Sequence, residues 1–212
     1  MRHNWLMFSV LTTVIVSGLA TIGVVLVQPP IRTPSSGTTD KSTSKAKDFL
    51  KTITQEIVEL EIQRAMLEPV FTPEAPLMQK IEYQLKSLRQ RLSQIPSNDH
   101  KATVNHAVFE AIKAKIAELE VKRALLEPVF IPEAPLMQKI ESQLKSLWQR
   151  IAQIQPNNQV AVNHAISEAI KAKIVELKAE RSLQPTQDSS TSPTVSSIDS
   201  KLKSLEKRLA LR

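Results

Sequence analysis

The segment LEPVFTPEAPLMQKIE at positions 67–82 returns almost unchanged as LEPVFIPEAPLMQKIE at positions 126–141. A shift of 59 positions superimposes residues 67–95 on residues 126–154, and 24 of those 29 residues are identical. Dense identity at a fixed period is the signature of an internal repeat. The chain is therefore predicted to contain at least two copies of one structural unit.

A third copy of the unit follows, and it is modified in its middle. At a shift of 58 positions, FEAIKAKIAELEVKRAL from Phe109 corresponds to SEAIKAKIVELKAERSL from Ser167. The segment PTQDSSTSPTVSS at 185–197 replaces EPVFIPEAPLMQK of the second copy at equal length and lacks most of its apolar residues. The third unit is expected to keep the helices of the repeat and to contain a polar low-complexity loop.

Within each unit, apolar residues recur alternately three and four positions apart, which is the spacing of a coiled-coil seam. Two such helices joined by a short linker are expected to fold back as an antiparallel hairpin. The predicted fold class is all-α, with an N-terminal transmembrane helix followed by three antiparallel helical hairpin repeats. These repeats are predicted to span residues 45–103, 104–161 and 162–212. The seam residues of the second unit are Phe109, Ile112, Ile116, Leu119, Leu126, Met137, Ile140, Leu144, Leu147, Ile151 and Ile154.

The repeated motif at 67–82 is predicted to be the bend of the hairpin. Glu68 and its equivalent Glu127 both precede a proline. Because a residue before proline avoids the helical region, the first helix is expected to stop there. The next helix is expected to begin at Pro73 or at Pro76, since an early proline loses no intrahelical hydrogen bond, and Thr72 is a candidate cap.

Composition argues against most enzyme classes. The 212 residues include three glycines and no cysteine, and Gly37 is the last glycine of the chain. This scarcity disfavours glycine-rich phosphate loops and nucleophile elbows, and it removes thiolate metal sites. No set of serine, histidine and acidic residues has local motif support. We expect no enzymatic activity, no cofactor and no small-molecule substrate.

The N-terminal segment WLMFSVLTTVIVSGLATIGVVLV at 5–27 carries no charged residue. It is long enough to cross a hydrocarbon core of about 30 Å. Residues 1–28 are therefore predicted to be a single-pass transmembrane anchor, with a cleaved signal peptide as the alternative. Residues 29–44 are rich in Pro, Ser and Thr and are predicted to be a disordered linker.

The sidedness of this anchor rests on the basic residues that flank it. A very short basic N-terminus, with Arg2 before the apolar run, is typical of a signal anchor that leaves the C-terminal bulk outside the cytoplasm. Arg32, Lys41 and Lys45 follow the apolar run and leave the cytoplasmic orientation open. The membrane is an expected partner in either orientation.

Recurring charges predict ion pairs inside the hairpins. An arginine occupies the same heptad position in all three copies, and an acidic residue lies beside the seam of the partner helix. We expect arginine–carboxylate pairs that fix the register of each hairpin, or else arginine stems that extend along the seam to water. The predicted pairs are Arg64 with Glu82, Arg123 with Glu141, and Arg181 with Asp199.

Apolar residues at the bends are candidate contacts for a partner. Val70 and Phe71 in the first bend correspond to Val129 and Phe130 in the second, and the third copy lacks the pair. These residues are expected either to pack locally against the leucines of the next helix or to form an exposed docking point.

The VNHA motif recurs in the second and third copies, with His106 and His164. No carboxylate or cysteine recurs beside these histidines at ligand spacing, so we interpret them as surface residues rather than metal ligands. Asn105 and Asn163 are predicted to cap helices.

The net charge of +7 is concentrated near the C-terminus, because the two complete repeats are almost balanced. The last helix can touch an anionic lipid or an envelope polymer, although cations at a helix C-terminus are also favourable by themselves. The balanced repeats do not favour nucleic acid as a partner. The residues for such an anionic contact are Lys201, Lys203, Lys207, Arg208 and Arg212.

The stretches FTPEAPLMQKIEYQLKSL and FIPEAPLMQKIESQLKSL resemble a segment of the polysaccharide co-polymerases, the Wzz-like chain-length determinants. In that family an aromatic residue, two prolines and a leucine heptad lead into a long extracytoplasmic helix. The resemblance implies membrane-anchored helical hairpins in the cell envelope.

The expected function is a non-enzymatic, membrane-anchored scaffold or spacer that mediates protein–protein assembly or self-association in the cell envelope. One alternative is an accessory subunit of a complex that exports or assembles a polysaccharide or another polymer. A second alternative is a module that binds an anionic partner through its basic C-terminal helix.

Overall fold

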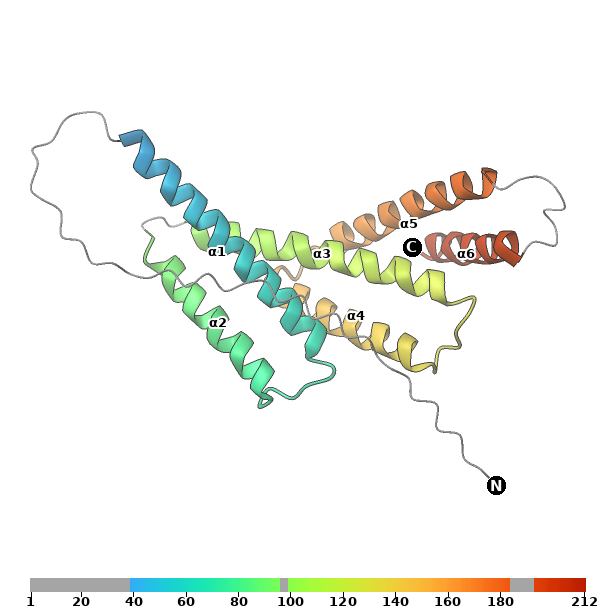
Figure 1. The fold of residues 1–212 in the computed structure, drawn as a ribbon, viewed down its shortest axis with the longest axis horizontal. Coiled ribbons are helices and arrows are strands. Elements are labelled where there is room, and N and C mark those ends of the chain that lie inside the picture. Colours follow the sequence, from blue (N-terminus) through green and yellow to red (C-terminus); the bar gives the residue numbers. More distant parts are fainter. Residues whose placement is uncertain (1–38, 96–98, 184–192) are drawn as a thin grey trace, which may run out of the picture. The chain divides into compact units, whose positions relative to one another are not determined.

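The computed structural model describes residues 39–95, 99–183 and 193–212, and residues Thr39–Arg212 form one compact unit. These described residues form six α-helices and no strand, which confirms the all-α class for this part of the chain (Figure 1). The helices are α1 (Thr39–Leu67), α2 (Pro76–Ser93), α3 (His100–Leu126), α4 (Pro135–Ile154), α5 (Gln159–Ser182) and α6 (Pro193–Ala210).

None of these helices is both long and apolar enough to cross a membrane. The predicted anchor at 5–27 lies outside the described residues, as does most of the predicted linker at 29–44. Helix α1 already begins at Thr39, however, so the end of that predicted linker is helical.

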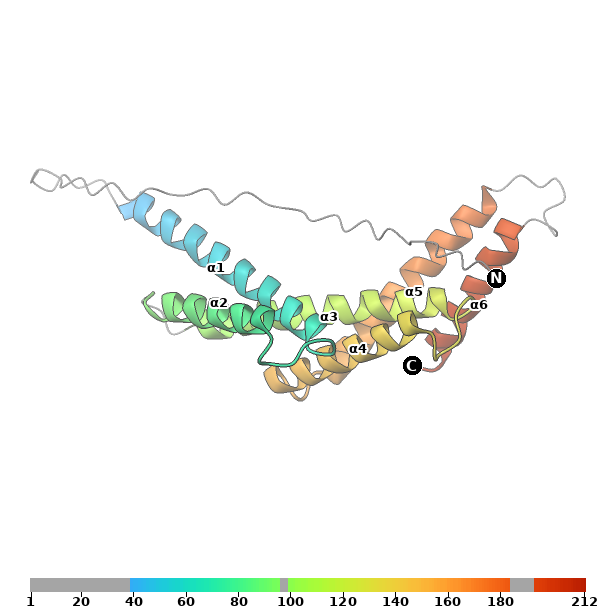
Figure 2. The same ribbon diagram turned by 60° about the horizontal axis from the view of Figure 1, so that its bottom comes forward.

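Consecutive helices pack together in pairs. Helix α1 packs on α2, α3 on α4, and α5 on α6, and the two members of each pair run in opposite directions (Figures 1 and 2). The second helix of each pair has its apolar residues on one side, and α2 buries Met78, Ile81, Leu85, Leu88 and Leu92. This spacing is the heptad seam that the sequence predicts.

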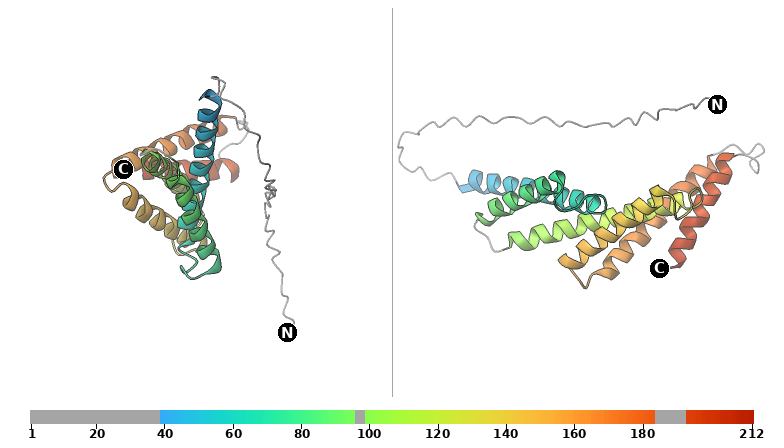
Figure 3. Two further views of the ribbon diagram at one scale, coloured as in Figure 1. Left: turned by 90° about the vertical axis from the view of Figure 1, so that its left-hand side faces the viewer. Right: turned by 90° about the horizontal axis from the view of Figure 1, so that it is seen from below.

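The hairpins also pack on one another through a recurring set of helix contacts. Helix α1 contacts α3 and α4 of the next hairpin, and α3 contacts α5 and α6 in the same way. Figure 3 gives two further views of this packing of successive hairpins. Contact between each unit and the next is the organisation of tandem helical-repeat proteins.

Helix α3 is packed on more than one side because it contacts helices of the hairpins before and after it. Helix α3 buries residues around much of its circumference. Its buried residues are Val104, Val108, Phe109, Ile112, Ile116, Ala117, Leu119, Glu120 and Ala124.

The two complete bends have the same backbone geometry. Helix α1 ends at Leu67, and the amides of Val70 and Phe71 both donate to the Leu67 carbonyl oxygen at 2.9 and 3.0 Å. In the second bend, the amides of Val129 and Phe130 donate in the same way to Leu126. The nearly identical sequence of the motif thus gives the same backbone hydrogen bonds at both bends.

Two details of the predicted bend are wrong. Glu127 keeps helical dihedral angles, with φ −50° and ψ −37°, although it precedes Pro128. The helix ends because proline has no amide hydrogen to continue the ladder. The next helix begins at Pro76 and Pro135, and Ala75 precedes the first of them without a side-chain cap, so Thr72 is not the cap.

Several predicted boundaries also shift. Helices α3 and α5 begin at His100 and Gln159, ahead of the predicted repeat starts at 104 and 162. Helix α6 begins at Pro193, inside the predicted loop at 185–197. Each of these helices extends towards the N-terminus as far as a segment that contains proline. Proline is the strongest helix breaker, and no residue between that segment and the predicted start stops the helix.

The predicted helix caps are wrong because α3 and α5 begin earlier in the sequence than predicted. Asn105 and Asn163 lie within α3 and α5, and Asp99 and Asn158 precede those helices instead.

Candidate functional site

A buried carboxylate joins the first hairpin to the second. Glu61 on α1 is only 1% exposed. Arg150 on α4 donates to it from Nε at 2.9 Å and from Nη2 at 2.6 Å, which is a bidentate contact. Arg89 on α2 forms a second ion pair with the same carboxylate. The glutamate therefore binds one arginine of its own hairpin and one of the next.

The same arrangement recurs where the second hairpin meets the third. Glu120 on α3 is repeat-equivalent to Glu61 and is also buried. Arg208 on α6 is repeat-equivalent to Arg150, and its Nη1 donates to Glu120 at 3.1 Å. Arg212 donates to the other oxygen of Glu120 at 2.9 Å. We call Glu61–Arg150 and Glu120–Arg208 the junction ion pairs.

A serine contact accompanies each junction ion pair. Ser146 on α4 donates to Glu68 at 2.6 Å, and its equivalent Ser204 on α6 donates to Glu127 at 3.0 Å. Arg208 also pairs with Glu127. At both junctions, two glutamates seven positions apart meet a serine and an arginine four positions apart.

These contacts favour one arrangement of the hairpins. An ionised carboxylate withdrawn from water is destabilising unless it is paired and hydrogen-bonded. Displacing one hairpin relative to the next would separate Glu61 from Arg150, although Arg89 of its own hairpin would still reach it, and would separate Glu120 from Arg208 and Arg212. We expect these pairs to fix the position of each hairpin on the next.

The third hairpin reverses the charge at this position. Lys178 on α5 stands where the other hairpins have Glu61 and Glu120, and it is exposed. It pairs at 3.1 Å with Glu206, which stands at the position of Arg89 in the first hairpin. The pair Glu61–Arg89 within the first hairpin is thus inverted in the third.

Neighbouring positions on α5 are polar or exposed as well. Ser182 stands where Ala65 and Ala124 are buried, and it is exposed. Val175, which corresponds to the buried Ala117, is 67% exposed. The terminal unit of a repeat array differs in this way from the units inside it, because no further unit covers its outer side.

The first hairpin carries the opposite kind of end. On α2, the residues Gln84, Ser87 and Arg91 correspond to Gln143, Ser146 and Arg150 of α4. The residues on α2 are exposed, whereas their α4 equivalents face α1, as the Gln143 contact with the Met66 carbonyl at 3.4 Å illustrates.

The adjoining part of α1 is also uncovered. Phe49 is 42% exposed, while its equivalents Val108 and Ile166 are 3% and 0% exposed. The guanidinium of Arg91 lies over the Phe49 ring, 5.2 Å from its centroid.

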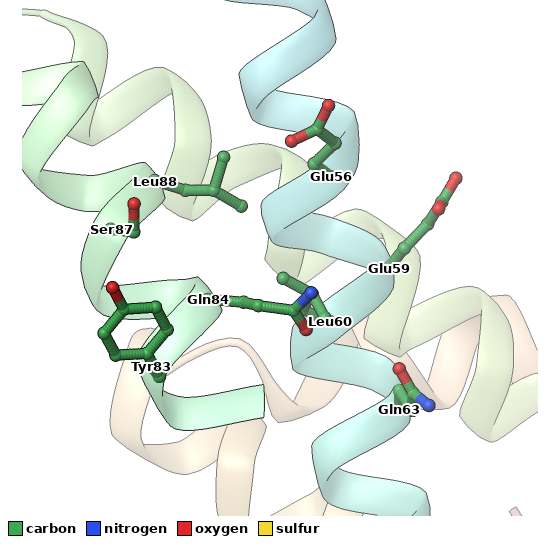
Figure 4. A pocket seen from close by; sticks show the side chains of 8 residues that line it. All are labelled: Glu56, Glu59, Leu60, Gln63, Tyr83, Gln84, Ser87 and Leu88. Atoms are coloured by element: carbon green, nitrogen blue, oxygen red, sulfur yellow. The ribbon is translucent and has the colours of Figure 1, made fainter. Parts of the chain in front are cut away.

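A hollow of about 370 Å³ lies between these two helices (Figure 4). We call Gln84, Ser87 and Arg91 of α2, with Phe49 and Leu60 of α1, the open face. The residues that line the hollow are Glu56, Glu59, Leu60, Gln63, Tyr83, Gln84, Ser87 and Leu88.

The structure brings each predicted register pair together. Arg64 Nε lies 2.8 Å from Glu82 Oε1, and Arg181 Nε lies 3.0 Å from Asp199 Oδ1. Arg123 pairs with Glu141 in the same way. The Arg64 and Arg123 side chains are 29% and 27% exposed, so pairing and partial contact with water occur together. Control of register by these pairs stays a prediction.

Sequence reasoning missed the junction ion pairs, because Glu61 and Glu120 resemble the solvated carboxylates of a helix surface. The repeats did contain a signal for the pair within the first hairpin, because Glu61 and Arg89 become Lys178 and Glu206 together, and a paired change of charge indicates contact. That signal does not reach the partner arginine of the next hairpin.

The bend residues are exposed at both complete bends. Val70 and Val129 are 62% and 67% exposed, and Phe71 and Phe130 are each 39% exposed. The leucines expected to cover them are themselves more than a third exposed, at 38% for Leu77 and 37% for Leu136.

The predicted anionic-partner contacts separate into two groups. Arg208 and Arg212 already pair with the buried Glu120. Contact of these residues with an anionic partner stays a prediction. Lys203 and Lys207 are exposed, and Lys201 is half-buried. His106 and His164 are exposed on α3 and α5, and the described residues hold no cluster of three or more potential metal ligands.

Comparisons with protein-family models, curated proteins and solved structures gave no match to this chain. Fold and site define its class by themselves: a tandem helical-hairpin repeat with buried ion pairs between successive hairpins.

Proposed function

We propose that the chain is a non-enzymatic scaffold that uses its stacked hairpins to mediate protein–protein assembly. The observation that carries this proposal is the duplication of an exposed apolar bend. Phe71 and Phe130 are exposed to the same extent in bends with the same backbone hydrogen bonds. The junction ion pairs hold those two bends on one packed unit.

Two identical bends on one unit offer a partner two equivalent contacts. Binding at both is stronger than binding at one, because the second contact forms within the same complex. A large apolar side chain that is exposed at a loop contributes little to folding and is a common anchor at interfaces. The described residues give no similar support to a catalytic function.

The proposed setting is the cell envelope, with residues 5–27 as a single-pass anchor and the hairpins outside the cytoplasm. The length and lack of charge of that segment support the anchor. The resemblance of the bend to polysaccharide co-polymerases supports a place beside a complex that exports or assembles a polymer.

The scaffold function is tested with the double variant Phe71→Ser and Phe130→Ser of the full chain. The matched control is Val160→Ser, which changes an apolar side chain that is 81% exposed on α5, away from both bends. Membranes carrying each protein are cross-linked, solubilised and purified, and proteins present at a fixed stoichiometry are identified.

We expect the wild type and the control to retain the same stoichiometric partner and the double variant to lose it. The double variant is expected to unfold at a somewhat lower temperature than the other two proteins, because each phenylalanine is 39% exposed and packs in part against its bend. Binding is therefore compared at a temperature at which all three proteins are folded. Retention of the partner by the double variant, or the lack of any stoichiometric partner, would contradict the proposed function.

A further inference from the structure

The second helix of every hairpin carries the same recognition residues. Ser146 and Arg150 on α4 bind glutamates of α1, and Ser204 and Arg208 on α6 bind glutamates of α3. In both cases the bound element is the first helix of the preceding hairpin. These surfaces are therefore built to receive an amphipathic helix with two glutamates.

The first hairpin carries the same serine and arginine on α2. In the described part of the chain, no helix of a preceding hairpin covers them. Ser87 and Arg91 stand on α2 at the positions of Ser146 and Arg150, and both are exposed. Phe49 is exposed where its equivalents Val108 and Ile166 are covered. The hollow beside them adjoins Leu60, which is half-buried although its equivalent Leu119 is 3% exposed.

We propose that the open face of the first hairpin binds an amphipathic helix of another protein, which carries two glutamates seven positions apart. The first glutamate pairs with Arg91, and the second accepts a hydrogen bond from Ser87. Apolar side chains of the bound helix cover Phe49 and Leu60. The two junctions within the chain are the structural precedent for the arginine and serine contacts.

A second copy of the chain does not fit as the occupant. Stacked end to end, it would present α5, which has Lys178 at the position of the first glutamate. The second glutamate position is taken by Pro185. An ammonium group against Arg91 is repulsive, and the required carboxylates are missing.

The chain's own N-terminal segment does not fit either. Residues 1–38 contain neither aspartate nor glutamate, so they cannot supply a carboxylate to Arg91. The first helices α1 and α3 have suitable glutamates, but these are bound within the junctions. Charge complementarity thus leaves a helix from a different protein.

The binding test uses a fluorescent peptide copy of residues 100–127, which contains Glu120 and Glu127 at the required spacing. Its affinity for the full chain is measured by fluorescence anisotropy. The protein variants are Arg91→Glu and, as the conservative change, Arg91→Lys. The matched control is Lys80→Glu, which makes an equal change of sign at another exposed position of α2.

We expect the wild type and the Lys80→Glu control to bind the peptide with equal affinity. Because the substitution lowers the net charge of the control protein, the affinities are compared over a range of salt concentrations. Arg91→Glu is expected to weaken binding by at least about tenfold, since it places a carboxylate against a carboxylate. A peptide with Glu120→Lys and Glu127→Lys is expected to bind the Arg91→Glu protein better than the wild type. This reciprocal preference separates recognition at the open face from exchange of the peptide into a junction.

Absence of binding to the wild type would overturn the proposal, as would equal binding to wild type and the Arg91→Glu variant. The test is independent of the scaffold function, because the bend residues lie outside the open face. The double variant Phe71→Ser and Phe130→Ser is expected to bind the peptide like the wild type, so failure of one proposal leaves the other measurable.

Discussion

At the scale of single residues, charge pairs of two kinds stabilise the described hairpins. Pairs within a hairpin, such as Arg123–Glu141, are partly exposed, with side-chain exposures of 27% and 46%. The junction ion pairs involve Glu61 and Glu120, which are almost completely buried. Exposed pairs contribute little to stability, whereas a buried charge that loses its partner is strongly destabilising.

The pair within a hairpin is predicted to be weak but measurable. A double-mutant cycle with Arg123→Ala and Glu141→Ala is expected to give a coupling free energy of about 0.5 kcal/mol, because water and salt screen both groups. Urea unfolding of the four proteins at low ionic strength provides the measurement. Zero coupling within error would show that the pair does not fix the register of the hairpin.

At the scale of helices and bends, the sequence predicted what local spacing determines. Heptads predicted two helices per unit, and the paired prolines predicted a bend that starts the second helix at Pro76 or Pro73. The register pairs followed from counting back along both helices from the bend. Each of these features depends on residues that lie within one hairpin.

The contacts between hairpins could not be predicted in this way. Which helices of successive hairpins meet depends on packing across some 60 positions, which no local period encodes. Glu120 lies between the apolar residues Leu119 and Val121, yet its place on a buried side becomes clear only when α6 is positioned against α3.

The different surroundings of equivalent helices lead to a second prediction. Leu60 on α1 and Leu119 on α3 occupy the same repeat position, but Leu60 is half-buried at the open face and Leu119 is 3% exposed. Leu119→Ala is expected to lower the free energy of unfolding by about 3 kcal/mol, as for other buried leucines.

Leu60→Ala removes the same atoms from a less enclosed site, so we expect a smaller loss of about 1 kcal/mol. Chemical denaturation of both variants makes the comparison, and each serves as the control of the other. Equal losses would contradict the difference in packing between the open face and the interior of the stack.

At the scale of the whole described unit, the array has two different ends. Its first hairpin exposes the residues that receive a helix, and its third hairpin replaces the glutamate by Lys178. Repeat arrays require terminal units that do not continue the stack, because an unmodified end can add further copies. The reversed charge at Lys178 is such a modification, and it makes α5 a poor partner for the open face of another copy.

The central claim is that buried junction ion pairs hold successive hairpins together, and a double-mutant cycle on Glu61 and Arg150 tests it most directly. The single changes are Glu61→Gln and Arg150→Met, with Lys145→Met as the matched control on an exposed part of α4. Because Arg89 still pairs with Glu61 after the change, we predict a loss of about 2 kcal/mol for Arg150→Met, a change near zero for the control, and a coupling free energy of about 1 kcal/mol or more. If Arg150→Met unfolds at the same urea concentration as the wild type and the coupling is zero, the hairpins are not held together by this pair.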